Sequence, residues 1–409
     1  MAKKKLVVIG GGAAGFFCAV NAARLCKDLE VIIAERTGKL LQKVKVSGGG
    51  RCNATHACFQ ISEMASRYPR GEKFVKKAFH QFFTTDTIEW FGSRGVPLKT
   101  ESDGRMFPEA NTSQAIIDCL LKEANQYKVQ VLMNREVKTI LPKQSGFNIQ
   151  FKNEEILAAD FVMLACGGFQ RLEQFDWLQN LGLQIVQPVP SLFTFNFPKH
   201  PLNNLMGVSV PKVAVKIMGS KLSSTGPILI THWGLSGPAV LRLSAFAARE
   251  LEAAKYQFKI NVNWHPEMNE NTCLEHLQML RHSAAAKRVV KENFTEMPAR
   301  LWEFLLTEAG IADDKRWADV TAASQNKLAK LICSYEIVAN GKTTFKEEFV
   351  TAGGIDLAEI DANTMMIKKH PGLFVGGEIM NVDGITGGYN FQHAWTSGFV
   401  AAKAITSLQ

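Results

Sequence analysis

The sequence predicts an α/β fold whose core is a parallel β-sheet, with a different kind of unit inserted into it. Three observations predict this. A glycine-rich turn joins a short apolar run to a helical pattern close to the start. A strand, a glycine-rich turn and a helix recur in that order between residues 373 and 405. A segment punctuated by prolines separates the two, and strands that alternate with helices are typical of parallel sheets.

The first turn has the spacing of a dinucleotide-binding motif. Residues 6–9 form an apolar run, as expected for a strand buried on both faces, and Gly10, Gly12 and Gly15 follow at G-x-G-x-x-G spacing. Gly10 allows the tight turn, Gly12 lets backbone approach a pyrophosphate, and Gly15 lets the helix pack against the strand. The phosphates then lie at the positive N-terminus of that helix.

An acidic residue ends the second apolar run, which covers residues 29–34. Glu35 can accept hydrogen bonds from both hydroxyls of an adenosine ribose, and its carboxylate would repel a 2′-phosphate. The pattern therefore favours FAD or NAD over NADP. Because the glycines stand between a strand and a helix, with the acid at the expected distance, we prefer a binding site to a turn that serves packing alone.

The composition is that of a globular enzyme. The chain is 46% hydrophobic and 21% charged. Its length of 409 residues predicts two or three folding units. No apolar run has the length of a membrane-spanning helix, and the start lacks the apolar segment of a signal peptide. The eight cysteines are scattered without a C-x-x-C pair, as is typical of reduced thiols in a cytoplasmic protein.

The net charge of +9 raises the question of a polyanionic partner. Basic clusters at residues 3–5, 39–45, 73–77 and 287–291 could attract nucleic acid. Such clusters more often form solvated faces and phosphate-binding groups, so we expect a small-molecule substrate and no nucleic acid. No metal-spaced set of histidines and cysteines is evident, and the oligomeric state is left open.

The pattern of predicted helices and strands changes at two points in the sequence. Short runs punctuated by proline replace the α/β pattern near residue 188, and the α/β pattern resumes near residue 347. A long loop is expected over residues 36–53. We predict a discontinuous Rossmann-like domain over residues 1–190 and 346–409, a β-barrel-like insert over 191–270 and 332–345, and a helical subdomain over 271–331.

Two further glycine-rich segments carry groups that suit a flavin. In the first, three consecutive glycines permit a loop that could pass close to a planar ring. Short polar groups and cations that could reach phosphates or a ring carbonyl flank these glycines, namely Lys43, Ser47, Arg51 and Asn53. In the second, Glu378 follows a strand end and suits a ribityl hydroxyl. The N–H groups of Asn390 and Phe391 would begin a helix that points at the ring.

The segment THWGLSGP supplies one candidate for acid–base chemistry. His232 and its small neighbours could form a roof over a flavin, although a single histidine more often has a structural role. Tyr389 and His393 have similar standing. We expect a substrate near Arg51, His232 and Tyr389, which are the three candidate catalytic residues.

Together, SGGGRCN, THWGLSGPA and GGEIMNVDGITGGYNFQHAWTSG resemble the BaiN-like flavoproteins, also labelled aminoacetone-oxidase-like FAD-binding enzymes. The likeness runs from the first strand to the last helix. It implies a two-dinucleotide-domain fold with the nicotinamide domain replaced, non-covalent FAD and oxidoreductase activity. Carried onto this sequence, it implies FAD contacts from Gly10, Gly12, Ala14, Gly15, Glu35, Arg36, Lys43, Ser47, Arg51, Asn53, Val137, Gly167, Glu378, Asn390 and Phe391.

Only one G-x-G-x-x-G is present, so a tightly held nicotinamide is not expected. We predict an FAD-dependent oxidoreductase that moves a hydride between the flavin and a small organic substrate, with NAD(P)H bound transiently as a possible donor. Two alternatives stay open. The chain could be a non-catalytic FAD-binding regulatory protein, or, given its basic charge, a tRNA-modifying flavoprotein.

Overall fold

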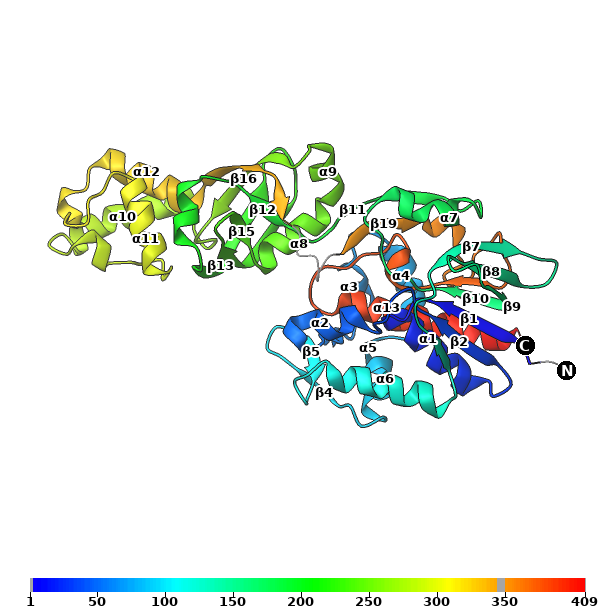
Figure 1. Ribbon diagram of the computed structural model, residues 1–409. Helices are drawn as coiled ribbons and strands as arrows, with labels where there is room; N and C mark the ends of the chain where they lie inside the picture. The colour runs from blue at the N-terminus through cyan, green and yellow to red at the C-terminus, as the bar shows by residue number, and fades with distance from the viewer. Residues whose placement is uncertain (1–2, 344–349, 409) are drawn as a thin grey trace. The chain divides into compact units, whose positions relative to one another are not determined.

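The computed structural model describes residues 3–343 and 350–408. The chain divides into two compact units, one formed by residues 1–191 and 345–409 and the other by residues 192–344. The first unit is therefore discontinuous, and each unit is described by itself (Figure 1).

A five-stranded parallel sheet forms the centre of the first unit, in the strand order β20-β10-β1-β2-β6. Every neighbouring pair is parallel, and Val8 of β1 lies between Ile33 of β2 and Met163 of β10. All three side chains are fully buried, as expected where both faces are covered. The strands are β1 (Lys5–Ile9), β2 (Glu30–Ala34), β6 (Gln130–Leu132), β10 (Phe161–Leu164) and β20 (Leu373–Val375).

Two helices from opposite ends of the sequence pack together in this unit. The helix α1 (Ala13–Leu25) lies against α13 (Tyr389–Ser407), the blue and red helices of Figure 1. Gly398 makes the close approach possible, because a Cβ there would lie 2.7 Å from the carbonyl oxygen of Ala14. The other helices of the unit are α2 (Gln42–Gly50), α3 (Ile61–Ala65), α4 (Glu72–Phe79), α5 (Thr84–Gly92), α6 (Gln114–Gln126) and α7 (Asp176–Gln179).

Smaller antiparallel sheets complete the first unit. One has the order β3-β5-β4, a second β7-β8-β9, and the pair β11–β19 joins residues that enter and leave the second unit. Their bounds are β3 (Thr55–His56), β4 (Leu98–Thr100), β5 (Arg105–Pro108), β7 (Val137–Pro142), β8 (Phe147–Phe151), β9 (Ile156–Ala159), β11 (Ile185–Pro190) and β19 (Thr351–Ile355).

The prediction of a loop throughout residues 36–53 is wrong. The helix α2 begins at Gln42, and the backbone angles depart from helical values from Ser47 onward. Positive φ angles of 58°, 68° and 82° at Gly48, Gly49 and Gly50 produce the kink. Val44 is the one residue of α2 that is buried. Ser113 also binds this segment, since its hydroxyl donates to the Lys45 carbonyl at 2.8 Å and its N–H to the Gly50 carbonyl at 2.8 Å.

The second unit contains a seven-stranded antiparallel sheet in the order β17-β16-β13-β14-β15-β12-β18. Residues after the helical region return to this sheet, since Tyr335 of β17 pairs with Val262 of β16. The strands are β12 (Thr194–Asn196), β13 (Ser209–Ile217), β14 (Ser223–Ile230), β15 (Gly234–Ser236), β16 (Gln257–Asn263), β17 (Tyr335–Asn340) and β18 (Lys342–Thr343).

Helices in the second unit share one hydrophobic core with its sheet. Buried Trp302 and Trp317 belong to the same cluster as Val215 of β13 and Ile260 of β16. The helices are α8 (Pro238–Phe246), α9 (Ala248–Ala253), α10 (Glu270–Ser283), α11 (Ala299–Glu308) and α12 (Ala322–Cys333). Over residues 3–343 and 350–408, no helix combines the length and apolar character needed to cross a membrane.

Candidate functional site

The glycine turn after β1 is held by contacts that leave little room at two of the three glycines of the G-x-G-x-x-G motif. A Cβ at Gly10, whose φ is +111°, would lie 2.4 Å from the carbonyl oxygen of Ala165. A Cβ at Gly15 would lie 2.0 Å from the carbonyl oxygen of Gly10. Gly10 and Gly15 therefore serve the packing of β1, β10 and α1.

Gly12 is different, because no described atom beyond its neighbours along the chain lies within 4 Å of an ideal Cβ placed there. It is the N-cap of α1, with an extended backbone, and the Phe16 N–H donates to its carbonyl at 2.9 Å. Gly167, after β10, has the same open surroundings and a φ of +75°. Both positions offer bare backbone at the edge where the parallel strands end, where ligands bind in α/β sheets.

Glu35 lies directly beside the glycine turn. Its Oε2 accepts the N–H of Gly11 at 2.8 Å, and its Oε1 accepts the N–H and hydroxyl of Thr37 at 2.9 and 2.8 Å. Arg36, next to it, is exposed. The carboxylate is thereby fixed at the tip of β2, where an adenosine ribose is expected.

Glu378 and Lys43 come from opposite ends of the sequence and form an ion pair. The other carboxylate oxygen of Glu378 accepts the Thr351 N–H at 3.0 Å. A Cβ at Gly168 would lie 3.1 Å from the Glu378 carboxyl carbon, and one at Gly377 would lie 2.9 Å from the Cβ of Ala14. The end of β10, the start of α1 and the 3₁₀ turn Gly377–Ile379 therefore meet in one region.

The N-terminus of α13 is tied to β3. With the Asn53 amide oriented to satisfy its neighbours, its oxygen accepts the Gly388 N–H at 3.0 Å and its nitrogen donates to the Thr55 carbonyl at 3.0 Å. A Cβ at Gly388, whose φ is +93°, would lie 2.4 Å from the same Thr55 oxygen. The Asn390 amide bonds both the N–H and the carbonyl of Gly384, at 2.8 and 2.9 Å. These contacts fix the direction in which the helix begins.

Arg51 is held by a carboxylate and an aromatic ring that sequence reasoning did not connect with it. Its Nη1 donates to Glu101 at 2.6 Å, and its guanidinium lies 4.0 Å from the ring centroid of Phe107. Arg105 donates to the other oxygen of Glu101 at 3.0 Å. The Ser47 hydroxyl donates to the Val44 carbonyl at 3.0 Å and so belongs to the kink of α2.

Tyr389, the first residue of α13, is buried and stacked on His56, with ring centroids 4.8 Å apart. The Nδ1 of His56 lies 2.9 Å from the Gly387 carbonyl. Burial is the main cause that lowers the pKa of His56, and the bond to Gly387 opposes it. The imidazole is therefore neutral near pH 7, with Nδ1 as the donor nitrogen.

A buried ion pair anchors the glycine-rich loop before α13. Arg70 Nε donates to Asp383 at 2.6 Å, and a second Arg70 nitrogen donates to the same carboxylate. The Ser191 hydroxyl bonds Arg70 at 2.9 Å and also donates to Asp383, which is fully buried. Burial raises the pKa of Asp383, and the bonds from Arg70 and Ser191 oppose that rise.

The remaining site candidates make contacts of other kinds. Val137 is the first residue of β7 and pairs with Phe151 in a peripheral sheet. The Phe391 ring is stacked on Trp395, with centroids 5.7 Å apart. His232 belongs to the second unit, where it is exposed and lies against the Trp233 ring. The first unit thus brings together the glycine turn, Glu35, Glu378, Asn53 and the start of α13.

A family model described as the HI0933-like protein Rossmann domain matches residues 4–404. The chain belongs to this family. Ribosomal RNA dihydrouridine synthase of Haemophilus influenzae is 30% identical over 98% of each chain. The 3-dehydro-bile acid delta(4,6)-reductase of Clostridium scindens is 27% identical, again over 98% of each. The prediction of the BaiN-like flavoproteins and of an FAD-dependent oxidoreductase is confirmed.

Solved structures share the fold of this HI0933-like protein. A flavocytochrome c3 fumarate reductase in its open conformation matches with a TM-score of 0.51 at 15% identity, covering 99% of this chain and 78% of the other. The parallel sheet and antiparallel layers described above are thus those of a Rossmann-like flavoprotein, as the sequence predicted.

The residues of the first unit fit FAD. Apart from their neighbours along the chain, Gly12, Gly49, Gly50 and Gly167 have no described protein atom within 4 Å of an added Cβ, as close approach of a cofactor requires. Glu35 and Glu378 would provide acceptors for the ribose and ribityl hydroxyls of this cofactor. The N-termini of α1 and α13 would provide N–H groups and positive dipoles for the pyrophosphate and for an electron-rich ring.

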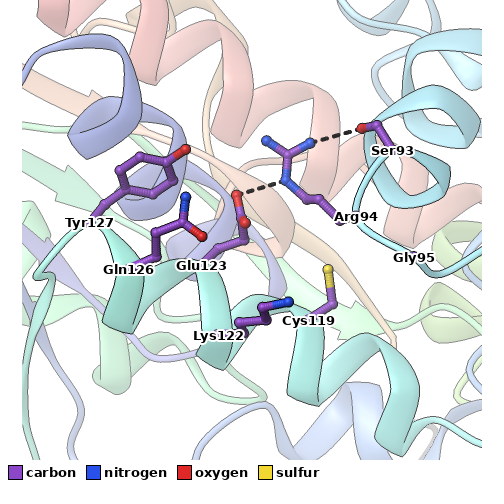
Figure 2. A pocket seen from close by; sticks show the side chains of 8 residues that line it. All are labelled: Ser93, Arg94, Gly95, Cys119, Lys122, Glu123, Gln126 and Tyr127. Carbon is purple, nitrogen blue, oxygen red and sulfur yellow. Dashed lines mark hydrogen bonds and ion pairs between the residues drawn. The ribbon is translucent and has the colours of Figure 1, made fainter.

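The pocket in Figure 2 lies elsewhere, between the residues that follow α5 and the second half of α6. An ion pair between Arg94 Nε and Glu123 Oε2, 2.7 Å long, crosses it. Burial raises the pKa of the Cys119 thiol beside it to about 11, so this thiol is unreactive at neutral pH. None of the predicted site residues lines this pocket.

We expect the free energy of unfolding to depend on pH because His393 is buried. This residue is 2% exposed, and burial lowers its pKa to about 4, against a smaller opposing effect of the Gly377 backbone. Below about pH 6.5 this histidine binds a proton in the unfolded chain but stays neutral in the folded chain. The free energy of unfolding therefore falls by up to about 3 kcal/mol as the pH falls towards 4. Urea unfolding across this range should show the loss.

The matched variants for this prediction are His393→Gln and His282→Gln, the latter at an exposed histidine. The first should flatten the pH dependence between about pH 6.5 and 4, and the second should leave it unchanged. An equal slope in wild type and His393→Gln would show that His393 does not cause the loss.

Proposed function

We propose that this chain reduces a carbon–carbon double bond conjugated to a carbonyl group, with FAD as cofactor. The proposal rests on what the substrates named for the two relatives have in common. Dihydrouridine differs from uridine by two hydrogens added across the ring double bond next to a carbonyl. A delta(4,6)-reductase of a 3-dehydro bile acid likewise removes double bonds conjugated to a ketone.

Such a reduction adds a hydride to the carbon remote from the carbonyl and a proton to the carbon beside it. When bound, FAD that has first been reduced by the electron donor would supply the hydride. The protein must orient the double bond, stabilise negative charge on the carbonyl oxygen and deliver the proton. NADH or NADPH, bound transiently, is the proposed electron donor.

Arg51 is the residue proposed to stabilise the carbonyl oxygen. Its guanidinium is always charged, and Glu101 and Phe107 fix its position from two sides. A preorganised donor of this kind contributes to the rate because it needs no rearrangement as charge develops. Tyr389, the first residue of α13, is proposed as a second catalytic residue. His232 stays a candidate proton donor from the sequence.

The proposal is tested by anaerobic reduction with NADH or NADPH, followed by addition of an acceptor. The flavin absorbance should bleach with the donor and return when a conjugated steroid enone or a uridine-containing RNA is added. The control is the same steroid with its double bond moved out of conjugation, which should leave the flavin bleached. Mass spectrometry should find two added hydrogens in the product.

Either of two results would contradict the proposal. Return of the absorbance with oxygen alone, and with none of the conjugated acceptors, would indicate an oxidase. Failure of both nicotinamide donors and of dithionite-reduced protein to reduce any acceptor would favour the non-catalytic alternative.

A further inference from the structure

We propose that the second unit binds the phosphate backbone of RNA through a basic surface at its helical end, so that RNA carries the double bond that is reduced. This inference rests on the proposed function. It assigns a substrate class and a contact surface that the sequence analysis did not favour. The surface consists of Lys287, Arg288, Lys291, Lys315 and Arg316, and is called the arginine ladder below.

Two short segments form the arginine ladder by antiparallel pairing. Arg288 and Arg316 are bridge partners, and backbone bonds on either side join Val289 N–H to the Lys315 carbonyl at 2.9 Å and Trp317 N–H to the Lys287 carbonyl at 3.1 Å. The pairing places the two arginines directly opposite each other. Their side chains therefore leave the backbone on the same face.

The buried residues next to Arg288 and Arg316 orient these two side chains toward solvent. Val289 and Trp317, one residue after each arginine, are fully buried in the core of the second unit. Since successive side chains of a paired segment alternate between faces, burial of these two directs Arg288 and Arg316 to solvent. All five cations of the ladder are exposed.

The five cations of the ladder outnumber by one the four carboxylates close to them in sequence, and most of them form no ion pair within the described part of the chain. Lys287 pairs with Glu292 at 2.7 Å, and this is the one ion pair made by the five cations within residues 3–343 and 350–408. Arg288 donates instead to the backbone carbonyl of Asp313, at 2.9 and 3.2 Å. The nearby carboxylates of Asp313, Asp314 and Asp319 are exposed, and none lies within 4.0 Å of a ladder cation.

Like charges directly opposite each other on one face destabilise a paired segment. The cost falls when an anion lies between them, and arginine binds phosphate oxygens through two parallel hydrogen bonds. The whole second unit is basic, with 18 Lys and Arg against 13 Asp and Glu over residues 192–344. A polyanion whose phosphates repeat along a chain fits this surface better than a single small anion.

RNA is the polyanion that the relatives favour. Two curated relatives are named ribosomal RNA dihydrouridine synthases, at 30% and 28% identity, and each matches nearly the whole chain. The uracil ring also contains a double bond conjugated to a carbonyl, which is the group proposed to be reduced. Phosphate contacts of this kind position a nucleic acid without reading its sequence.

The test measures RNA binding by the FAD-loaded full chain as a function of salt, with polyuridylate and an unmodified ribosomal RNA transcript as probes. The variant is Arg288→Gln with Arg316→Gln. The matched control is Lys221→Gln with Lys259→Gln, which removes two exposed cations of the same unit. Loss of two phosphate contacts should lower the salt slope of log affinity by about 2 and weaken binding by about tenfold or more at low salt. The control should bind as wild type does.

Reduction of a small steroid enone is measured in parallel and should be the same in all three proteins. Absence of RNA binding by wild type at low salt, or an equal loss in the ladder and control variants, overturns the inference. Binding to anionic lipid vesicles in place of RNA also overturns it. Intact RNA binding without any enone or uridine reduction leaves the ladder supported and the proposed function contradicted.

Discussion

Replacement of Arg70 by methionine is expected to lower the free energy of unfolding by about 3–5 kcal/mol. Asp383 is fully buried, and Arg70 donates two hydrogen bonds to its carboxylate. Without the guanidinium, only the Ser191 hydroxyl would remain of the three donors to this carboxylate described above. Urea unfolding near neutral pH measures the loss.

The expected loss extends to the cofactor site because of where Asp383 lies. Its loop continues through Gly384, which the Asn390 side chain bonds, to the first turn of α13. A displaced carboxylate would therefore move the helix N-terminus proposed to face the flavin. Retention of FAD should fall together with stability.

Arg67→Met is the matched control, because Arg67 makes an exposed ion pair with Glu63. An exposed pair of this spacing contributes about 0.5 kcal/mol or less. The double variant Arg70→Met with Asp383→Asn tests the cause. If it regains most of the lost stability, the uncompensated charge of Asp383 is the cause of the loss. Equal losses in Arg70→Met and Arg67→Met would refute the importance of burial.

Gly12→Asp is expected to weaken FAD binding by at least about a hundredfold while the chain stays folded. The added side chain would meet no described protein atom within 4 Å of its Cβ, and an aspartate at the N-cap favours a helix. A bound pyrophosphate would instead meet a second negative charge and lose access to the N–H groups of α1. Titration with FAD, followed by fluorescence, measures the affinity.

Two comparisons make this result specific. Gly92→Asp adds the same charge at an exposed glycine that is equally open, at the end of α5, and should retain normal FAD affinity. Gly15→Ala, in contrast, places a Cβ 2.0 Å from the Gly10 carbonyl oxygen and should destabilise the fold itself. Normal FAD binding by folded Gly12→Asp would exclude the glycine turn as the phosphate site.

The sequence predicted those parts of the site that are marked by a short motif or by a residue that directly follows a strand. Gly10, Gly12 and Gly15 have fixed spacing, and Glu35 and Glu378 each follow the end of a strand of the parallel sheet, β2 and β20. These features depend on short stretches of backbone. They are therefore readable before the fold is known.

The parts that the sequence did not predict depend on contacts between distant residues. Asp383 was visible within a glycine-rich motif, but nothing in the sequence marks Arg70 as its partner. His56 and Glu101 likewise lie outside every motif, and their places beside Tyr389 and Arg51 follow from the small β3-β5-β4 sheet and its turns. The helical part of α2 was missed because only Val44 of this helix is buried, so it has no periodic apolar pattern, and because its bonds to Ser113 join residues distant in the sequence.

The most direct test of the account is the amount and attachment of flavin in the purified protein. The glycine turn, Glu35, Glu378 and the start of α13 are proposed to hold one FAD without a covalent bond. The account predicts a yellow protein with one FAD per chain, all of it released into solution when the chain is denatured. A colourless protein that takes up no FAD after reconstitution, or flavin that stays attached to the denatured chain, would contradict it.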